Sequence, residues 1–404
     1  MQTGARYQAV LEILTEILKD KIPADRIIND YLRSKKYIGS KDRRFITDMV
    51  WHIIRNRLKL EFDTKSSDAR KILLYANKDK ITEIFDDSKY GLSPLTDEEK
   101  TWLSSENEEP YPDYVESECP EWLFEKIKNS AFCKALNFSA TTDIRCHNIA
   151  RNDLQQKLSA EGIETSFGAY SPHCLKISDR LVLNNCMAWQ DGFFEIQDEA
   201  SQIASILVDA KPNHKIIDYC CGAGGKSLAI SNELNNQGNI LAYDIDPKRL
   251  ENIKPRMHRL KVKNISLTDI IADSDKDFDR FVLDAPCSGS GTWRRSPDAK
   301  FRLTKEKLFG LTKIQADLLD IAGKKTAKSG RIIYITCSIL KEENEDIIEN
   351  FLKGNNNFAP INLKDLWAKK IGSPYPYSSE KYLRMSPLTT STDGFFICIL
   401  ERMY

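Results

Sequence analysis

A chain of 404 residues is long enough for two or three domains, each with a sizeable core. Charged residues make up 29% and apolar residues 41%, no apolar run approaches the roughly 18 residues of a membrane span, and the acidic, amphipathic start is unlike a signal peptide, so we expect a cytoplasmic protein with no membrane partner. Ten scattered cysteines without a C-x-x-C pair predict no zinc or other metal site and no disulfide framework.

The first part of the chain is expected to be helical. Apolar residues recur with helical spacing over 5–18, 24–32 and 42–58, and Pro23 and Gly39 separate these stretches. Residues 1–60 hold 13 lysines and arginines against 7 acidic residues. This excess suits a nucleic acid, although a solvated helix face produces the same bias, so charge alone leaves RNA or DNA binding open.

The next segment is acidic. Residues 83–118 hold 12 acidic residues against 2 lysines, and a stretch rich in Ser, Glu and Pro near 104–113 predicts a linker. Another helix is expected over 120–132. Residues 1–134 are therefore predicted to form a helical region with an acidic linker.

Residues 135–195 change to a mixed pattern. A strand is expected over 142–150, a helix over 151–162 that Gly162 closes, and short strands over 174–178 and 181–183. These elements predict a small α+β unit.

Apolar strands alternate with helices from residue 196 to residue 404. Strands are expected at 215–221, 239–246, 265–270, 279–287 and 331–338, with helices at 198–210, from Lys226 onward, and at 247–260, 305–330 and 342–353. Residues 382–388 and 394–402 predict two final strands that pair antiparallel. Continuous apolar strands between helices predict a mostly parallel, doubly wound α/β sheet of the Rossmann-like kind.

A glycine-rich turn marks a candidate cofactor site. The stretch DYCCGAGGKS, Asp218–Ser227, lies where the first strand turns into a helix, and its three glycines let the backbone approach a ligand. Ligands of such sheets bind outside the carboxyl ends of the strands. The turn lacks the spacing of a phosphate-binding Walker loop, and by itself it suits NAD, FAD, a nucleotide or S-adenosylmethionine.

Carboxylates end the next two strands. Asp244 follows the glycine turn by about twenty residues, where it can accept hydrogen bonds from ribose hydroxyls, and Asp269 reaches the same edge, where it can hold a base amino group. Ordinary strand-end carboxylates are the alternative. Polar groups at three strand ends in a row favour a nucleoside cofactor.

Two cysteines end the fourth and fifth strands. Cys287 follows Asp284-Ala285-Pro286, and Cys337 lies in Thr-Cys-Ser. In a doubly wound sheet the first, fourth and fifth strands are expected to be neighbours, so both thiols lie at one edge beside the cofactor. A thiolate that adds to carbon 6 of cytosine makes carbon 5 nucleophilic toward a methylsulfonium. Asp284 is placed to offset charge near ring nitrogen 3, and a second thiol can assist product release.

Several motifs together resemble one family. The stretches Glu195–Gln202, Asp218–Ser227, LDAPCSGSGTWRRSPD, YITCS and Thr392–Leu400 are similar to motifs of the RNA cytosine-5 methyltransferases of the Nop2/Sun class, and most of all to those of the bacterial Sun (Fmu) ribosomal RNA enzymes. The N-terminal helices resemble their NusB-type RNA-binding bundle, and the 135–195 unit resembles their small RRM-like extension.

The resemblance implies a role for each matching residue. Cys337 would be the nucleophile, Cys287 would aid product release, and Asp284 would contact the base and align the methyl donor. S-adenosylmethionine would be held by the turn residues Cys220, Cys221, Gly222, Ala223, Gly224, Gly225 and Lys226, with Asp244 on the ribose, Asp269 on the adenine and Arg249 supporting the pocket. Arg294 and Arg295 would meet RNA phosphates.

The family turn usually reads CAAPGGKT, so this chain departs from it at Cys221, Gly222 and Ala223. All three replacements are small, and we expect altered turn stiffness with binding retained. The expected substrate is a cytosine of RNA, most of all small-subunit ribosomal RNA, and the expected assembly is a monomer.

Four other classes of protein fit these motifs less well. An exocyclic-amino methyltransferase needs a polar-Pro-Pro-aromatic tetrad where this chain has DAPC, and a DNA cytosine-5 enzyme would use a Pro-Cys thiol on the fourth strand without needing Cys337. A catalytically silent RNA-binding scaffold would not need an intact cysteine pair. A Rossmann dehydrogenase would space its glycines differently.

Overall fold

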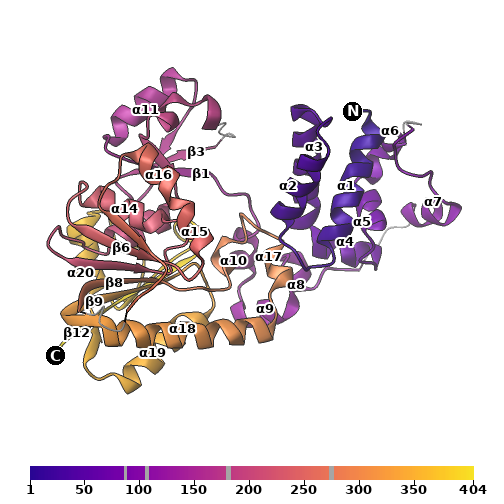
Figure 1. The fold of residues 1–404 in the computed structure, drawn as a ribbon. Coiled ribbons are helices and arrows are strands. Elements are labelled where there is room, and N and C mark those ends of the chain that lie inside the picture. Colours follow the sequence, from indigo (N-terminus) through magenta and orange to yellow (C-terminus); the bar gives the residue numbers. More distant parts are fainter. Residues whose placement is uncertain (86–88, 105–108, 179–182, 273–276) are drawn as a thin grey trace. The chain divides into compact units, whose positions relative to one another are not determined.

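A computed structural model describes residues 1–85, 89–104, 109–178, 183–272 and 277–404 (Figure 1). By their internal contacts the residues form two compact units. One comprises Met1–Ser139 and Trp293–Thr304, and the other comprises Ala140–Thr292 and Lys305–Tyr404. Within the described ranges, no helix is long and apolar enough to cross a membrane. The domain boundaries expected at residues 134 and 195 stay predictions.

The first unit is helical, as its periodicity predicts. Its core centres on α1 and α3, where side chains such as Val10, Ile13, Ile46 and Val50 are almost fully buried. The helices of this unit are α1 (Thr3–Ile17), α2 (Ala24–Ser34), α3 (Ser40–Arg55), α4 (Arg57–Thr64), α5 (Ala69–Tyr75), α6 (Ile81–Ile84), α7 (Asp97–Leu103), α8 (Asp113–Glu116), α9 (Glu121–Ile127), α10 (Ser130–Ala135) and α17 (Ala299–Arg302), with a 3-10 turn at Lys78–Lys80.

Two of the expected helices are interrupted. The helix predicted over 42–58 ends at Arg55, and α4 begins after Asn56, which leaves the helical conformation with φ −107° and ψ 20°. The helix predicted over 120–132 divides into α9 and α10 because Lys128 adopts a left-handed conformation with φ +50°. Part of the linker expected near 104–113 falls outside the described residues.

The second unit begins with a small antiparallel sheet of order β2-β3-β1-β4. Residue Ile144 of β1 faces Leu175 of β3 on one side and Ile196 of β4 on the other. The elements are β1 (Thr142–Cys146), α11 (Arg151–Ala160), β2 (Ser166–Phe167), β3 (Cys174–Ile177), a 3-10 turn (Leu183–Asn185), α12 (Met187–Gln190) and β4 (Phe194–Ile196). The strand predicted over 142–150 is shorter than expected, and most of the one predicted over 181–183 lies outside the described residues. The RRM-like and NusB-like resemblances remain predictions.

The large sheet has the order β10-β12-β9-β8-β5-β6-β7, with β11 paired to β12. Its strands β5 to β9 run parallel, while β12 runs antiparallel to β9, β10 and β11. Both the doubly wound sheet and the adjacency of the first, fourth and fifth predicted strands are confirmed. The strands are β5 (Lys215–Tyr219), β6 (Asn239–Tyr243), β7 (Ile265–Thr268), β8 (Phe278–Asp284), β9 (Thr326–Thr336), β10 (Phe358–Pro360), β11 (Tyr382–Met385) and β12 (Phe395–Arg402).

Helices cover both faces of this sheet, and alternate strand residues enter two different cores. Ile216 packs with residues of α13, α14 and α20, whereas Ile217 packs with residues of α18 and α19. Figure 1 shows α18 and α19 along one face. The helices are α13 (Glu199–Ile206), α14 (Gly225–Glu233), α15 (Pro247–Glu251), α16 (Ile253–Leu260), α18 (Lys305–Lys325), α19 (Glu345–Gly354) and α20 (Leu363–Lys370), with 3-10 turns at Ser290–Thr292 and Lys341–Glu343.

Two further boundaries differ from expectation. The helix predicted over 247–260 divides at Asn252 into α15 and α16. The helix predicted over 305–330 ends at Lys325, and β9 starts at Thr326 with an irregular register against β8. Ser329, with φ +60°, lies in that irregular part.

Candidate active site

The glycine turn follows β5 and is hydrogen-bonded to the last residue of β6. Backbone N–H groups of Cys220 and Cys221 both donate to the carbonyl oxygen of Tyr243, at 3.0 and 2.9 Å. Burial raises the pKa of Cys220 to about 12 and also raises that of Cys221, so these two thiols stay protonated near neutral pH. Both cysteines therefore shape the turn and are poor nucleophiles.

Two glycines of the turn have a backbone conformation that disfavours any side chain. Gly222 and Gly224 have φ of +58° and +76°, and a Cβ on them would meet Arg249 Nη2 at 2.6 Å and Ile253 Cγ1 at 2.8 Å. At Gly225, by contrast, no described atom lies within 4 Å of the position of a Cβ. The first residue of α14 therefore borders open space in which a ligand can approach the backbone.

Asp244 holds the turn in place. Its Oδ2 accepts a hydrogen bond from the Gly222 N–H at 2.8 Å, and its Oδ1 accepts one from the Asp246 N–H at 3.0 Å. The guanidinium of Arg249 lies 3.3 Å from Oδ2, and Asp244 is only 1% exposed. The Arg249 side chain, which is 56% exposed, thus pairs with the same oxygen that holds the Gly222 N–H. Asp269 follows the end of β7 and is exposed.

Lys226 and Asp284 form an ion pair at the same edge of the sheet. The Lys226 Nζ lies 2.7 Å from Asp284 Oδ2, and the aspartate side chain is about one-third exposed. Burial is the largest single influence and acts to lower the pKa of Lys226, but the charge and hydrogen bond of Asp284, together with the charge of Asp218, outweigh it and raise the pKa. The pair therefore presents a partly accessible carboxyl group backed by a buried ammonium.

Asp218, near the end of β5 and just before the turn, is fully buried. Ser227 donates its hydroxyl to Oδ2 at 2.5 Å, while Oδ1 has no hydrogen-bond partner among the residues that the structure describes. Burial raises the pKa of Asp218 to about 6. The turn, the strand-end carboxylates and the open space at Gly225 together fit the amino, hydroxyl and carboxyl groups of S-adenosylmethionine.

The two cysteines that were predicted to share one site have their sulfur atoms in contact. Strand β8 ends at Asp284, which pairs with Ile335 of the parallel strand β9, and the loops that follow bring Cys287 Sγ within 3.4 Å of Cys337 Sγ. Both thiols are half-buried. Contact with Cys337 and burial raise the pKa of Cys287 well above its usual range. The arrangement allows one sulfur to act while the other holds a proton.

Sequence reasoning missed the groups that hold these loops together. Glu343 accepts hydrogen bonds from Ser288, Ser338 and Gln315 at the base of the two cysteine loops. Glu343 lies in the acidic run Lys-Glu-Glu-Asn-Glu, which in sequence is typical of an exposed helix start. Only its position directly after the Thr-Cys-Ser strand end could have drawn attention to it.

The predicted RNA contacts lie outside this cluster. Arg294 and Arg295 belong to the segment Trp293–Thr304, which packs within the helical unit. Arg294 is 6% exposed and its carbonyl oxygen accepts a hydrogen bond from Arg55, whereas Arg295 is exposed. Phosphate binding by these arginines stays a prediction, and exposure favours Arg295 over Arg294.

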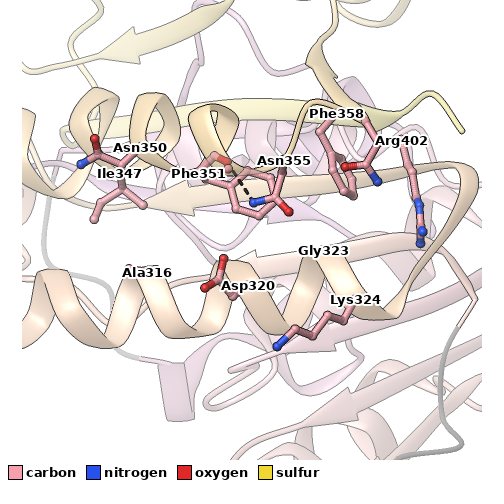
Figure 2. Close-up of a pocket in the computed structure, with 12 residues that line it drawn as sticks. Ala316, Asp320, Gly323, Lys324, Ile347, Asn350, Phe351, Asn355, Phe358 and Arg402 are labelled. Carbon is pink, nitrogen blue, oxygen red and sulfur yellow. Dashed lines mark hydrogen bonds between the residues drawn. The ribbon is translucent and has the colours of Figure 1, made fainter.

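A separate pocket of about 650 Å³ lies between α18 and α19 (Figure 2). Asp320 and Lys324 of α18, Phe351 of α19, Asn355 directly after α19, and Arg402 of β12 are among its lining residues. Every predicted site residue is described by the structure, and none of them lines this pocket. It is therefore distinct from the candidate active site.

The sheet order, the glycine turn and the strand-end residues define a Rossmann-like domain with a candidate cofactor site at the carboxyl ends of its strands. A family model described as 16S rRNA methyltransferase RsmB/F matches residues 205–401. Over this region the chain is similar to the RsmB/F family, and the expected resemblance to Sun-type enzymes is confirmed.

Individual relatives agree with this assignment. A protein named probable ribosomal RNA small subunit methyltransferase B from Bacillus subtilis (strain 168) is 28% identical over 309 residues, which cover 71% of this chain and 67% of that protein. The chain spans about 56–67% of the length of four such curated relatives.

Solved structures share the fold. The crystal structure of PH0851 is similar with a TM-score of 0.76 and 23% identity over 99% of both chains. The structure of NSun6 from Pyrococcus horikoshii with SFG is similar with a TM-score of 0.61 and 20% identity, covering 70% of this chain and 96% of that one.

Proposed function

We propose that this protein transfers a methyl group from S-adenosylmethionine to carbon 5 of a cytosine in RNA, with small-subunit ribosomal RNA as the substrate. Cys337 would form a covalent bond to carbon 6, and Cys287 would help to resolve it. The observation that carries the proposal is the 3.4 Å approach of the two sulfur atoms at neighbouring strand ends, next to the Lys226–Asp284 pair.

The first step makes carbon 5 reactive. The thiolate of Cys337 forms a bond to carbon 6, and the electron pair of the carbon 5–carbon 6 double bond is pushed into the ring toward nitrogen 3. Asp284 accepts a hydrogen bond from the exocyclic amino group, and the Lys226 ammonium offsets the negative charge that develops beside it. When bound, S-adenosylmethionine supplies an electrophilic methyl group and leaves as a neutral thioether.

The second step releases the product. Carbon 5 has taken the methyl group and still carries its proton, which a base must remove. The electron pair of that carbon–hydrogen bond restores the double bond, and the Cys337–carbon 6 bond breaks to return the thiolate. Cys287, which holds a proton of its own and contacts Cys337, is placed to relay the carbon 5 proton to a base.

The RNA must present an unpaired base to this site. Flipping a base out of a stem costs a few kcal/mol, and less in a loop or an unfolded RNA. The excess of basic residues over 1–60 supports the helical unit as the part that holds the RNA.

Replacing each cysteine in turn tests the mechanism. The protein is incubated with labelled S-adenosylmethionine and ribosomal RNA and resolved on a denaturing gel. Because it lacks the nucleophile, Cys337→Ala should lose methylation by more than about a thousandfold. Because release fails, Cys287→Ala should accumulate an RNA–protein adduct. Cys186→Ala, at a buried cysteine of the small sheet unit, is the matched control and should methylate normally.

Two results would contradict the proposal. If Cys337→Ala still methylates while Cys287→Ala is inactive without an adduct, the nucleophile is on β8. If the wild-type protein methylates no RNA, a non-catalytic RNA-binding role becomes the better account.

A further inference from the structure

Glu343 is a buried carboxylate that receives four hydrogen bonds. It ends the 3-10 turn Lys341–Glu343 after β9 and is 0% exposed. Its Oε1 accepts from the Ser288 N–H at 2.8 Å and from Gln315 Nε2 at 3.0 Å. Its Oε2 accepts from the hydroxyl of Ser288 at 2.5 Å and from the hydroxyl of Ser338. Four donors around one carboxyl group suit an ionised side chain, which only accepts.

Three of these donors belong to the residues directly after the two cysteines. Ser288 follows Cys287 and Ser338 follows Cys337, and the two serines lie fifty positions apart in the chain. We infer that Glu343 is a positioning residue, which ties the loop after β8 to the loop after β9 and so sets the distance between the two thiols. The inference rests on the proposed function, because that function is what needs the two thiols together.

Other contacts hold Cys337 alone. Asn344 accepts a hydrogen bond from the Thr336 hydroxyl at 2.6 Å and donates one to the Ser338 carbonyl at 2.9 Å, which secures the backbone on both sides of Cys337. The hydroxyls of Ser290 and Ser338 also link the two loops, at 3.0 Å, but as a neutral pair. The charged bonds of Glu343 are therefore the strongest side-chain link from Cys337 to Cys287.

The charge of Glu343 also acts on Cys287. Contact with Cys337 and burial are the main reasons that the pKa of Cys287 is high, and the negative charge of Glu343 raises it further. Glu343 thus adds to the effect of Cys337 and of burial, which favour the protonated form of Cys287. This supports a division of labour in which Cys337 provides the thiolate.

The distance between the thiols can be measured without any RNA. The protein is equilibrated with mixtures of reduced and oxidised glutathione, and peptide mass mapping gives the fraction of Cys287 joined to Cys337. This fraction defines the effective concentration of one thiol toward the other. Glu343→Gln should lower it about tenfold, because an amide donates where a carboxylate accepted and loses the charged bonds. The exposed Glu349→Gln should leave it unchanged.

Smaller variants separate positioning from folding. Ser288→Ala and Ser338→Ala each remove one hydroxyl and should each lower the effective concentration by less, and their effects should not add to that of Glu343→Gln. In methylation assays Glu343→Gln should lower kcat with KM for both substrates nearly unchanged. The inference would be overturned if Glu343→Gln leaves the effective concentration of one thiol toward the other unchanged. If Glu343→Gln fails to fold, an unchanged effective concentration in both serine variants would overturn it. Thiol coupling that depends on Glu343 in a protein that methylates no RNA would uphold the positioning role and reject the proposed function.

Discussion

At the scale of single residues, the buried His147 makes the stability of this protein depend on pH. His147 is 1% exposed, and its Nε2 lies 2.9 Å from the Leu260 carbonyl oxygen, to which it donates as a neutral ring. Its Nδ1 is buried without a hydrogen-bond partner in the part of the chain that the structure describes. Burial, and then the charge of Arg145, lower the pKa of His147 to about 4.

This lowered pKa predicts a loss of stability in mild acid. The unfolded chain takes up a proton on His147 near pH 6.5, whereas the folded protein does so near pH 4, so the contribution is complete above pH 6.5 and is lost as pH falls toward 4. Between pH 7 and pH 5 the wild-type protein should lose on the order of 1–2 kcal/mol that His147→Gln does not lose. Thermal unfolding of the wild-type protein and of His147→Gln at pH 7 and at pH 5 measures this loss of stability.

The exposed His258→Gln provides the control and should keep the wild-type dependence on pH. An equal loss of stability in His147→Gln and the wild-type protein would show that other groups cause it.

At the scale of elements, a close backbone crossing supports the active-site loop. Gly291, in the turn after Cys287, donates its N–H to the Cys337 carbonyl at 2.9 Å and accepts from the Gly394 N–H at 2.8 Å. A Cβ on Gly291 would lie 2.1 Å from the Gly394 carbonyl oxygen. The loop after β8 is therefore fastened both to β9 and to the segment that leads into β12.

Gly291→Ala should force these segments apart. We expect the free energy of unfolding to fall by about 1–3 kcal/mol, as for other overpacked sites, and adduct formation to fall with it. Chemical denaturation measures the first effect. Gly310→Ala is the matched control because a Cβ there meets no described atom within 4 Å, and in the helix α18 it should stabilise by up to about 1 kcal/mol. Equal stability of the two variants would contradict the packing argument.

At the scale of the whole molecule, charge is divided unevenly along the chain. The helical unit begins with an excess of basic residues, although the 404 residues carry no net charge. Lys36 and Lys41 are exposed in this unit. If they contact phosphates, Lys36→Ser and Lys41→Ser should weaken RNA binding and each lower the slope of log affinity against log salt by about 1.

Filter binding of ribosomal RNA at several salt concentrations tests this prediction. Lys328→Ser, at an exposed lysine of the other unit, should leave the salt slope unchanged. If none of the three substitutions changes the salt slope, the excess of basic residues over 1–60 does not contribute to RNA binding.

Local sequence patterns predicted much of the fold. Alternation of apolar strands and helices predicted the parallel sheet, and the glycine turn and the two cysteines were recognisable as short motifs. Helix ends were less predictable: Lys128 itself does not mark the left-handed conformation that divides the helix expected over 120–132, although the neighbouring Asn129 is a favoured N-cap residue and caps α10.

The sequence by itself determined most of the elements, the candidate site residues and the family that the chain resembles, because periodicity and motifs are properties of neighbouring residues. Tertiary structure alone decided that Arg249 pairs with Asp244, that Arg294 is buried, and that Glu343 joins the loops of two cysteines whose sulfur atoms lie 3.4 Å apart. Each of these contacts joins side chains on different elements. Their distances depend on how the helices and the sheet pack, which no local pattern records.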